Sequence, residues 1–262
     1  MIPIHNLPSS DAIDISCVCT DIDDTLTLEG RLLPESFDAL WRLRDAGIRV
    51  VPVTGRPAGW CDCIIREWPV DAIVGENGAF CWYRDNGRIV EMVHPEAIGS
   101  MEKRLSAMAQ TVLERFPEAS LARDQKYRIY DLAIDFREDV NLDFETAEQI
   151  ASLCRELGAV AKVSSIHVNA WFGTYDKLGM VERYLNRIGF DERRMAREVC
   201  FCGDSPNDEP MFSFFPNSVG VANVFEMAPL MHTLPRYITS ASFGRGFSEF
   251  VDVLLEKRVI NS

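Results

Sequence analysis

Short apolar runs alternate with amphipathic stretches over the first part of the chain. The runs Ile13–Thr20, Ile48–Val53 and Ala72–Val74 are rich in β-forming residues, and each predicts a short buried strand. The stretches between them predict two helices, one over 34–47 and one that ends near Trp68. Strands that alternate with helices in this rhythm indicate a parallel sheet covered by helices.

The pattern changes near residue 80. Two apolar segments, Phe80–Tyr83 and Ile89-Val90, flank Asn86-Gly87, which predicts a hairpin closed by a type I′ turn. A polar–apolar alternation over Arg128–Phe136 predicts a half-buried strand. This part also contains two predicted helices and one or two further strands, at 98–116, 144–157 and 160–172. Helices beside antiparallel strands indicate a small α+β module.

The strand–helix rhythm then returns. It predicts a helix over 176–188, strands over Val199–Cys202 and Ser218–Val221, and a final helix over about 247–257. The expected fold class is therefore α/β, with a Rossmann-like parallel-sheet core interrupted by an inserted α+β cap domain. We place the core at residues 1–83 and 173–262 and the cap at residues 84–172.

The chain is acidic, with 27 Lys and Arg against 40 Asp and Glu and a formal net charge of −13. Such a surface repels polyanions, so we expect no nucleic-acid partner and no anionic membrane partner. No apolar run reaches the roughly 18 residues of a membrane span, and the residues after Met1 lack the pattern of a secretory signal. We therefore expect the 8 cysteines to be reduced and the protein to be cytoplasmic. The sequence leaves the oligomeric state open.

Carboxylates crowd the end of the first predicted strand, in the segment Asp21-Ile22-Asp23-Asp24-Thr25. Ligands bind at the carboxyl ends of strands in open α/β sheets. Closely spaced carboxylates repel one another and stay ionised when a cation or a specific donor lies nearby. An oxygen-only ligand set suits Mg²⁺, which takes one or two carboxylates, water and substrate phosphate. The alternative is a solvated acidic turn.

Three further segments follow predicted strands or open predicted helices. A hydroxyl and backbone N–H groups in the turn Val53–Arg56 can hold phosphate oxygens. Lys177 stands in the first turn of a helix, where a positive charge is unfavourable, so a nearby anion would explain it. The segment Gly203-Asp204-Ser205-Pro206-Asn207-Asp208 would add Asp204 and Asp208 to an acidic site, or serve only as a helix N-cap.

The order of these segments resembles that of the haloacid dehalogenase-like phosphatase superfamily, over essentially the whole chain. The insertion lies between the second and third motifs, where the type-2 caps of that family sit. Its αββ-like content and the segment Val74–Ala79 are similar to subfamily IIB, which holds sugar phosphatases. The matching motifs are Asp21-x-Asp23-x-Thr25, Thr54, Lys177 and Gly203-Asp204-x-x-Asn207-Asp208.

The resemblance implies a role for each motif. Asp21 would attack phosphorus and form an aspartyl-phosphate, and Asp23 would protonate the leaving alcohol and then activate water. Thr54 and Lys177 would hold the phosphoryl oxygens. Phosphoryl transfer needs mainly positioning and charge neutralisation, which these residue types can supply.

The resemblance also implies a Mg²⁺ site. The ion would be held by the Asp21 side chain, the Asp23 backbone carbonyl and Asp204, with Asp208 bound directly or through water. One departure is Asp24, where many relatives carry Gly. It adds negative charge beside the expected metal and removes no catalytic group.

The cap of this family contacts the leaving group, so substrate contacts are expected there. Lys126 and Arg128 could meet an anionic substrate. His167, Asn169 and Trp171 alternate along one strand and share a face, which suits a sugar. Each set could instead be a solvent-facing strand surface. The core candidates for substrate contact are Thr54, Gly55, Arg56, Asn77 and Asn207.

The cysteines repeat a spacing. Cys17 and Cys19 precede Asp21 as Cys200 and Cys202 precede Asp204, so the four thiols would cluster if the two strands were neighbours. Small buried hydrophobic residues explain them better than a metal or redox site.

The function expected from the sequence is a Mg²⁺-dependent phosphomonoesterase acting on a phosphorylated sugar or related small metabolite. One alternative is a phosphosugar mutase of the same superfamily, which would return the phosphoryl group to its product. Another is a non-catalytic metal-binding scaffold. The substrate stays open among sucrose phosphate, mannosyl-3-phosphoglycerate, trehalose phosphate and simple hexose phosphates.

Overall fold

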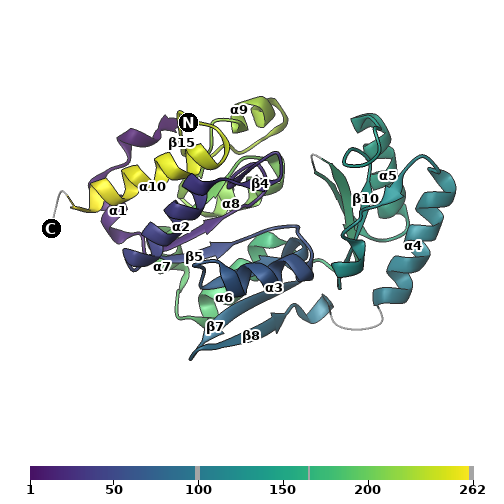
Figure 1. Cartoon of the computed structure of the whole chain (residues 1–262), viewed down its shortest axis with the longest axis horizontal. Coiled ribbons are helices and arrows are strands. Elements are labelled where there is room, and N and C mark those ends of the chain that lie inside the picture. The colour runs from purple at the N-terminus through teal and green to yellow at the C-terminus, as the bar shows by residue number, and fades with distance from the viewer. Residues whose placement is uncertain (98–100, 165, 260–262) are drawn as a thin grey trace.

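A six-stranded parallel sheet forms the centre of the molecule. The computed structural model describes residues 1–97, 101–164 and 166–259. The strand order is β1-β15-β14-β13-β2-β5, and each neighbouring pair is parallel (Figure 1). The predicted parallel α/β core is therefore confirmed. The strands are β1 (Ile2–Pro3), β2 (Cys17–Thr20), β5 (Arg49–Pro52), β13 (Val199–Gly203), β14 (Asn217–Gly220) and β15 (Tyr237–Ile238).

Helices cover both faces of this sheet. Alternate strand residues point to opposite sides, so Val18 and Val50 pack with Leu40 in one hydrophobic cluster. Cys19 and Val51 belong to a second cluster on the other side. The first face is covered by α1 (Ser9–Asp14), α2 (Pro34–Asp45), α3 (Ala58–Glu67) and α10 (Phe243–Val259). The second face is covered by α6 (Lys177–Arg187), α7 (Glu192–Glu198) and α8 (Glu209–Phe214). Smaller elements are the paired strands β3 (Thr27–Leu28) and β4 (Arg31–Leu32) and the helix α9 (Val224–Met227).

The predicted hairpin is confirmed. Strands β7 (Phe80–Asp85) and β8 (Arg88–Val93) pair antiparallel, and Asn86 and Gly87 both have positive φ, as a type I′ turn requires. Strand β7 also pairs with β6 (Ala72–Gly75), and an isolated parallel bridge joins Val53 to Val74. The hairpin thus continues the core side of the molecule. The division at residue 84 stays a prediction, and we propose that the insertion begins after β8.

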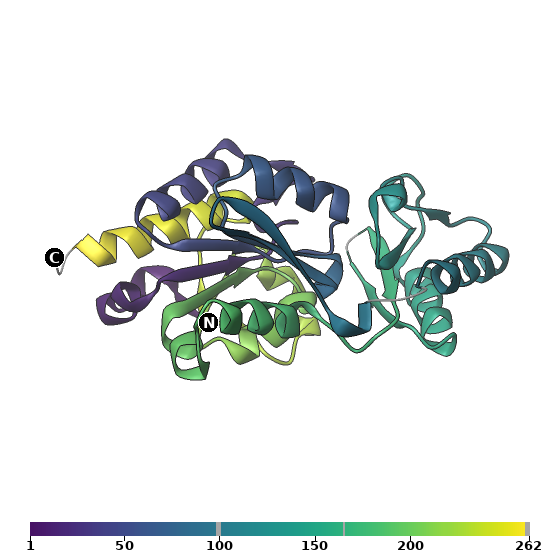
Figure 2. The ribbon, with the colours of Figure 1, turned by 90° about the horizontal axis from the view of Figure 1, so that it is seen from below.

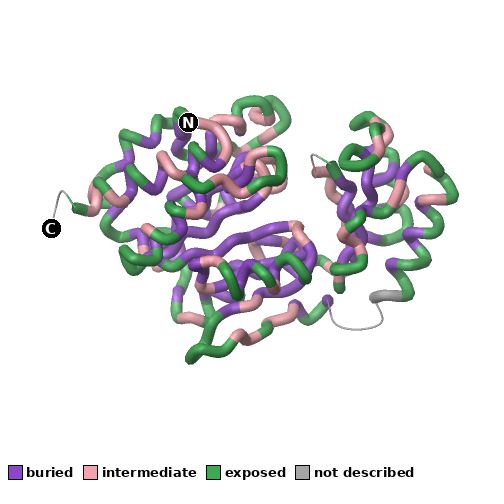
Figure 3. The backbone as a smooth tube through the Cα atoms, viewed as in Figure 1, coloured by how far each residue is buried: buried purple, intermediate pink, exposed green. Residues whose placement is uncertain are grey.

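A second lobe is built on a four-stranded antiparallel sheet in the order β11-β12-β10-β9 (Figure 2). One face packs on two helices in its own hydrophobic cluster, and each lobe has a buried interior (Figure 3). We call this lobe the cap. Its elements are α4 (Met101–Arg115), β9 (Ser120–Leu121), β10 (Asp131–Asp135), α5 (Phe144–Glu156), β11 (Val160–Val163) and β12 (His167–Trp171).

Several elements differ from the prediction. The run from Ile13 is not all strand, because Ser9–Asp14 forms helix α1 and the strand begins at Cys17. Strand β10 is buried along its whole length, because Asp131 on its polar face contacts Asn77 of the core and Asp135 accepts backbone N–H groups of residues 137–139. The predicted helix start at residue 98 lies outside the described residues. Among the described helices, none has the length and apolarity that crossing a bilayer requires.

The cysteines of the two Cys-x-Cys segments, Cys17 and Cys19 in β2 and Cys200 and Cys202 in β13, do not form one cluster. Strands β2 and β13 are neighbours, but Cys200 stands opposite Val18 rather than opposite Cys17. This register sends Cys17 and Cys19 to one face of the sheet and Cys200 and Cys202 to the other. They are free, buried thiols, each packed as a small core residue.

Candidate active site

The site lies where three neighbouring parallel strands end. Strand β2 runs directly into Asp21, β5 into the turn that holds Thr54, and β13 into Asp204. The Asp21 N–H donates to the carbonyl of Cys202 at 2.9 Å, which ties the first and last of these strand ends together. Segments far apart in the sequence thus meet at one edge of the sheet, as predicted for this fold.

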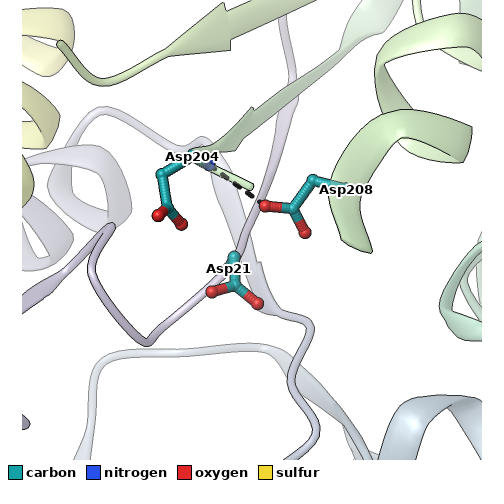
Figure 4. A group of neighbouring side chains, drawn as sticks. All are labelled: Asp21, Asp204 and Asp208. Atoms are coloured by element: carbon teal, nitrogen blue, oxygen red, sulfur yellow. Dashed lines mark hydrogen bonds between the residues drawn. The ribbon is translucent and has the colours of Figure 1, made fainter. Parts of the chain in front are cut away.

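Three carboxylates converge at this edge. Each of Asp21, Asp204 and Asp208 offers one oxygen, and these oxygens lie within 4.8 Å of one another (Figure 4). Asp208 Oδ2 accepts from the backbone N–H of Asp204 at 3.0 Å, which fixes the last carboxylate against the loop after β13. Thr25 Oγ1 donates to Asp204 Oδ1 at 2.9 Å. All three acids are buried, so hydrogen bonds rather than solvent hold them in place.

Lys177 is the cation of this group. Its Nζ lies 2.6 Å from Asp21 Oδ1 and 3.2 Å from Asp208 Oδ1, and its side chain is 9% exposed. Asp176 caps helix α6 by accepting from the Gly179 N–H, which places Lys177 at the first position of the helix. The unfavourable position of a lysine at a helix start is therefore offset by two carboxylates.

Burial sets the electrostatics of the site. It raises the pKa of Asp21 to about 8, although Lys177 works to lower it, and the neighbouring acids raise it further. Burial and Asp208 also raise the pKa of Asp204 well above its ordinary range. Burial alone would lower the pKa of Lys177, but Asp208 and Asp21 raise it. The group thus holds three buried carboxylates, and its one ammonium pairs with two of them, Asp21 and Asp208.

This imbalance fits a divalent cation. Oxygen ligands at close range, buried and short of positive charge, are the set that Mg²⁺ prefers. A bound cation would compensate the charge that one lysine leaves uncompensated. The residues present therefore match the predicted metal site for Asp21, Asp204 and Asp208.

Asp23 is held away from these acids by Arg56. The guanidinium donates from Nε to both carboxylate oxygens, at 3.0 and 3.1 Å, and from Nη2 to Oδ1 at 2.5 Å. Arg56 also stacks on Trp60, with its central carbon 4.5 Å from the ring centroid. Because the Asp23 side chain is 48% exposed, it stands at the mouth of the site and can exchange this partner for another.

Asp24 occupies a backbone conformation that favours glycine. Its φ is 58°, in the left-handed region where Asp and Asn are the side chains best tolerated. Its carbonyl accepts from Asn223 Nδ2 at 3.0 Å, and its N–H donates to Thr27. Burial and the neighbouring Asp23 raise its pKa. The departure from the family pattern is therefore compatible with the turn.

The turn after β5 is compact. Thr54 is fully buried, and its Oγ1 accepts from the backbone N–H of Arg56 at 3.0 Å. Gly55 has no side chain, and a Cβ there would lie 3.0 Å from Asn77 Oδ1 and 3.4 Å from Asn169 Nδ2. The glycine therefore lets one core asparagine and one cap asparagine approach the same turn.

The predicted cap residues have different surroundings. Lys126 is exposed and lies over the ring of Tyr127. His167 Nε2 lies 2.9 Å from Glu138 Oε2, so its ring already has an acidic partner.

The other predicted residues lie nearer the core. Asn169 is buried and lies beside Gly55, and Trp171 donates its ring N–H to the carbonyl of Tyr175. Asn207, from the core, lines a pocket between α5, β11 and α8.

Arg128 is already bound by groups of the protein itself. Its side chain is 3% exposed and pairs with Asp131 and Asp124. It also donates to the carbonyl of Gly55 at 2.9 Å, which links the cap to the core. A substrate anion would have to displace buried Asp131 to reach it. We therefore propose a positioning role for Arg128 rather than the direct substrate contact expected from the sequence.

Two residues near the site were not among the predicted ones. Buried Glu76 accepts backbone N–H groups from Ala58 in the core and from Ile129–Asp131 in the segment that leads into β10. Lys162 stands opposite Asn169 in the cap sheet and faces the same side. The segment 74–79, singled out in the sequence, contains Glu76. The register between Val160–Val163 and β12 would have placed Lys162 opposite Asn169, but the sequence does not give this register.

Comparison with known proteins agrees with this geometry. Residues 18–101 match the model of the haloacid dehalogenase-like hydrolase family. A phosphoglycolate phosphatase from Methanothrix thermoacetophila is 28% identical over 243 residues, which cover 91% of this chain and 96% of that protein.

Solved structures share the fold. Protein 0175 of Thermoplasma acidophilum superposes with a TM-score of 0.71 at 16% identity, covering 94% of this chain and 99% of the other. A subclass IIB sugar phosphatase gives a TM-score of 0.64 at 13% identity, covering 90% and 98%. The chain is therefore similar to the haloacid dehalogenase-like hydrolases, in sequence over residues 18–101 and in fold over most of its length.

Proposed function

We propose that the protein is a Mg²⁺-dependent phosphomonoesterase that acts on a small phosphorylated metabolite. The observation that carries this proposal is the contact between Lys177 and both Asp21 and Asp208, beside Asp204. A nucleophilic carboxylate, a cation for the phosphoryl oxygens and an acidic metal set are then present together. The names of the relatives, which are phosphoglycolate phosphatases, support the same class of reaction.

In the first step, a carboxylate oxygen of Asp21 attacks phosphorus. The bond from phosphorus to the leaving oxygen breaks, and Asp23 gives that oxygen a proton. The ion pair with Arg56 holds Asp23 at the mouth of the site, so Asp23 must exchange this partner to reach the leaving group. A covalent aspartyl-phosphate divides one difficult displacement into two easier ones.

In the second step, Asp23 takes a proton from water, and the water oxygen attacks phosphorus. The bond to Asp21 breaks, and inorganic phosphate leaves with the free carboxylate regenerated. Asp23 thus serves as acid and then as base, for which its exposed position is suited.

The remaining residues position the phosphoryl group. The Lys177 ammonium faces Asp21 directly, so it can bind a phosphoryl oxygen while it orients the nucleophile. The hydroxyl of Thr54 lies at the end of the neighbouring strand and can donate to a second oxygen. Asp21, Asp204 and Asp208, with the Asp23 carbonyl, would hold Mg²⁺. When bound, the ion supplies positive charge to the phosphoryl oxygens.

The test is phosphate release from a panel of phosphorylated sugars and acids, with and without Mg²⁺. Wild type should act on at least one compound in a Mg²⁺-dependent manner, and Asp21→Asn should lower its rate by roughly 10³-fold or more. Asp62→Asn is the matched control, because Asp62 is a half-exposed acid that pairs with Arg66 on α3. Unimpaired hydrolysis by Asp21→Asn, or no Mg²⁺-dependent hydrolysis by wild type, would overturn the proposal.

A further inference from the structure

The cap sheet turns a polar face toward the core. Residues directly opposite one another on neighbouring strands share a face. Lys162 of β11 stands opposite Asn169 of β12, and Asn169 stands opposite Ala133 of β10. The residues of the other face, such as Val168, belong to the hydrophobic cluster of the cap. Asn169 on this face lies beside Gly55, so the face meets the core at the turn after β5.

Asn169 on this face has an unused acceptor. The residue is 8% exposed, and its Oδ1 is buried without a hydrogen-bond partner. Its Nδ2 lies beside Gly55, in the turn that would hold the phosphoryl group. A buried polar atom that lacks a partner is rare in proteins and marks a place where a ligand or an ordered group is expected.

Lys162 lies next to this acceptor. It is partly buried, and within the described residues its side chain has no hydrogen bond and no ion pair. Burial and Lys177 lower its pKa, while Asp176 and Asp208 raise it, so it lies within electrostatic reach of the phosphoryl site. An ammonium that is partly desolvated and unpaired gains free energy when an anion binds to it.

The other charged groups nearby are already paired. Lys162 and Asn207 line a pocket of about 540 Å³ between cap and core. In the same pocket, Arg155 pairs with Glu148, and Glu209 accepts the backbone N–H groups of His232 and Thr233. Among the described pocket residues, Lys162 is thus the cation left without a counter-charge.

We propose that Lys162, with Asn169 beside it, forms the subsite for the leaving group and binds a carboxylate there. The substrate class is then a small phosphorylated carboxylic acid. Lys162 Nζ meets the carboxylate, and Asn169 Oδ1 accepts from the same ammonium and orients it. This inference rests on the proposed function, because it assumes that the phosphoryl group binds at Asp21 and Lys177.

The test compares two substrates that differ in one group. 2-Phosphoglycolate carries a carboxylate where 2-hydroxyethyl phosphate carries a neutral hydroxymethyl group. We expect Lys162→Met to lower kcat/KM for 2-phosphoglycolate by roughly 30-fold or more, the cost of truncating one partner of a buried charge pair. For 2-hydroxyethyl phosphate, kcat/KM should change by less than about threefold, and Lys162→Arg should retain part of the preference for the acid.

Lys103→Met is the matched control, since Lys103 is an exposed cap lysine and its removal changes the net charge equally. It should leave both rates unchanged. Equal losses on both substrates would assign Lys162 to the phosphoryl group and overturn the inference. No loss on the acid, or hydrolysis of sugar phosphates without hydrolysis of the acid, would also overturn it, whereas the proposed function would stand. Absence of Mg²⁺-dependent phosphate release from every compound would instead refute the proposed function.

Discussion

Replacing Lys177 by methionine tests the electrostatic balance of the site. The side chain keeps its approximate size and loses the charge that faces Asp21 at 2.6 Å and Asp208 at 3.2 Å. Removing one partner of a buried ion pair leaves an uncompensated buried charge and costs about 3–5 kcal/mol. We expect Lys177→Met to lower the free energy of unfolding by about that amount at pH 8 in the presence of a chelator.

The pH dependence of this loss has a definite sign. In the folded protein burial raises the pKa of Asp21 to about 8, against 3.8 as the ordinary value, and loss of Lys177 would raise it further. The folded state then binds more protons than the unfolded state between these values, so stability falls as pH rises through this window. Wild type and variant share this fall below pH 8, so the deficit of the variant should stay nearly constant from pH 4 to about pH 7. It should then grow as pH rises through 8, where Asp21 ionises more readily in the protein that retains Lys177.

The assay is urea unfolding of wild type, Lys177→Met and the exposed control Lys103→Met, with chelator and with Mg²⁺. The control should stay within about 0.5 kcal/mol of wild type, as surface substitutions usually do. Mg²⁺ should recover part of the loss, because a cation replaces the missing charge. If Lys177→Met were as stable as the control at pH 8 in chelator, Asp21 and Asp208 would not depend on this ammonium.

Four further outcomes are expected. Thr54→Val should lower kcat/KM roughly 10²-fold, the effect of losing one donor to a developing charge, while Thr54→Ser keeps most activity in the phosphate-release assay. Arg128→Met should lower the free energy of unfolding by about 3–5 kcal/mol in urea, because Asp131 is fully buried; a change below 1 kcal/mol would refute the link. Asp24→Gly should raise the free energy of unfolding by about 0.5 kcal/mol in the same urea assay, since glycine adopts the positive φ of this position without strain. The apparent Mg²⁺ affinity, measured by calorimetry, should rise about tenfold per pH unit up to pH 8, because a proton competes for Asp21, and a flat profile would count against this competition.

The motif positions could be predicted because acids follow apolar strands. Asp21 and Asp204 each come directly after a short apolar run, and the carboxyl ends of parallel strands meet at one edge. The resemblance to the superfamily supplied the assumption that the two strands are neighbours. The pairing of β13 with β2 confirms that assumption.

The partners of the cap residues could not be predicted in the same way. From the sequence, Arg128 was expected to be available to an anionic substrate. The fold instead places Asp131, Asp124 and the Gly55 carbonyl around it. Lys162 depends on register, because a shift of one residue would turn it to the apolar face of the cap. Register and tertiary partners come from contacts between distant segments, which local patterns do not contain.

The cysteines show the same limit. Their spacing suggested a cluster of four thiols, and the strands are indeed neighbours. The pairing of Cys200 with Val18 nevertheless sends the two pairs to opposite faces. Strand adjacency alone therefore does not decide which side chains meet.

Trapping the covalent enzyme tests the central claim most directly. Wild type is mixed with Mg²⁺ and a substrate found in the phosphate-release panel, quenched in acid within one turnover, digested and examined by mass spectrometry. We predict the added mass of one phosphoryl group on the peptide that contains Asp21, and no such mass in Asp21→Asn. Phosphate release with no protein-bound phosphoryl group, or a phosphoryl group on another residue, would contradict the account.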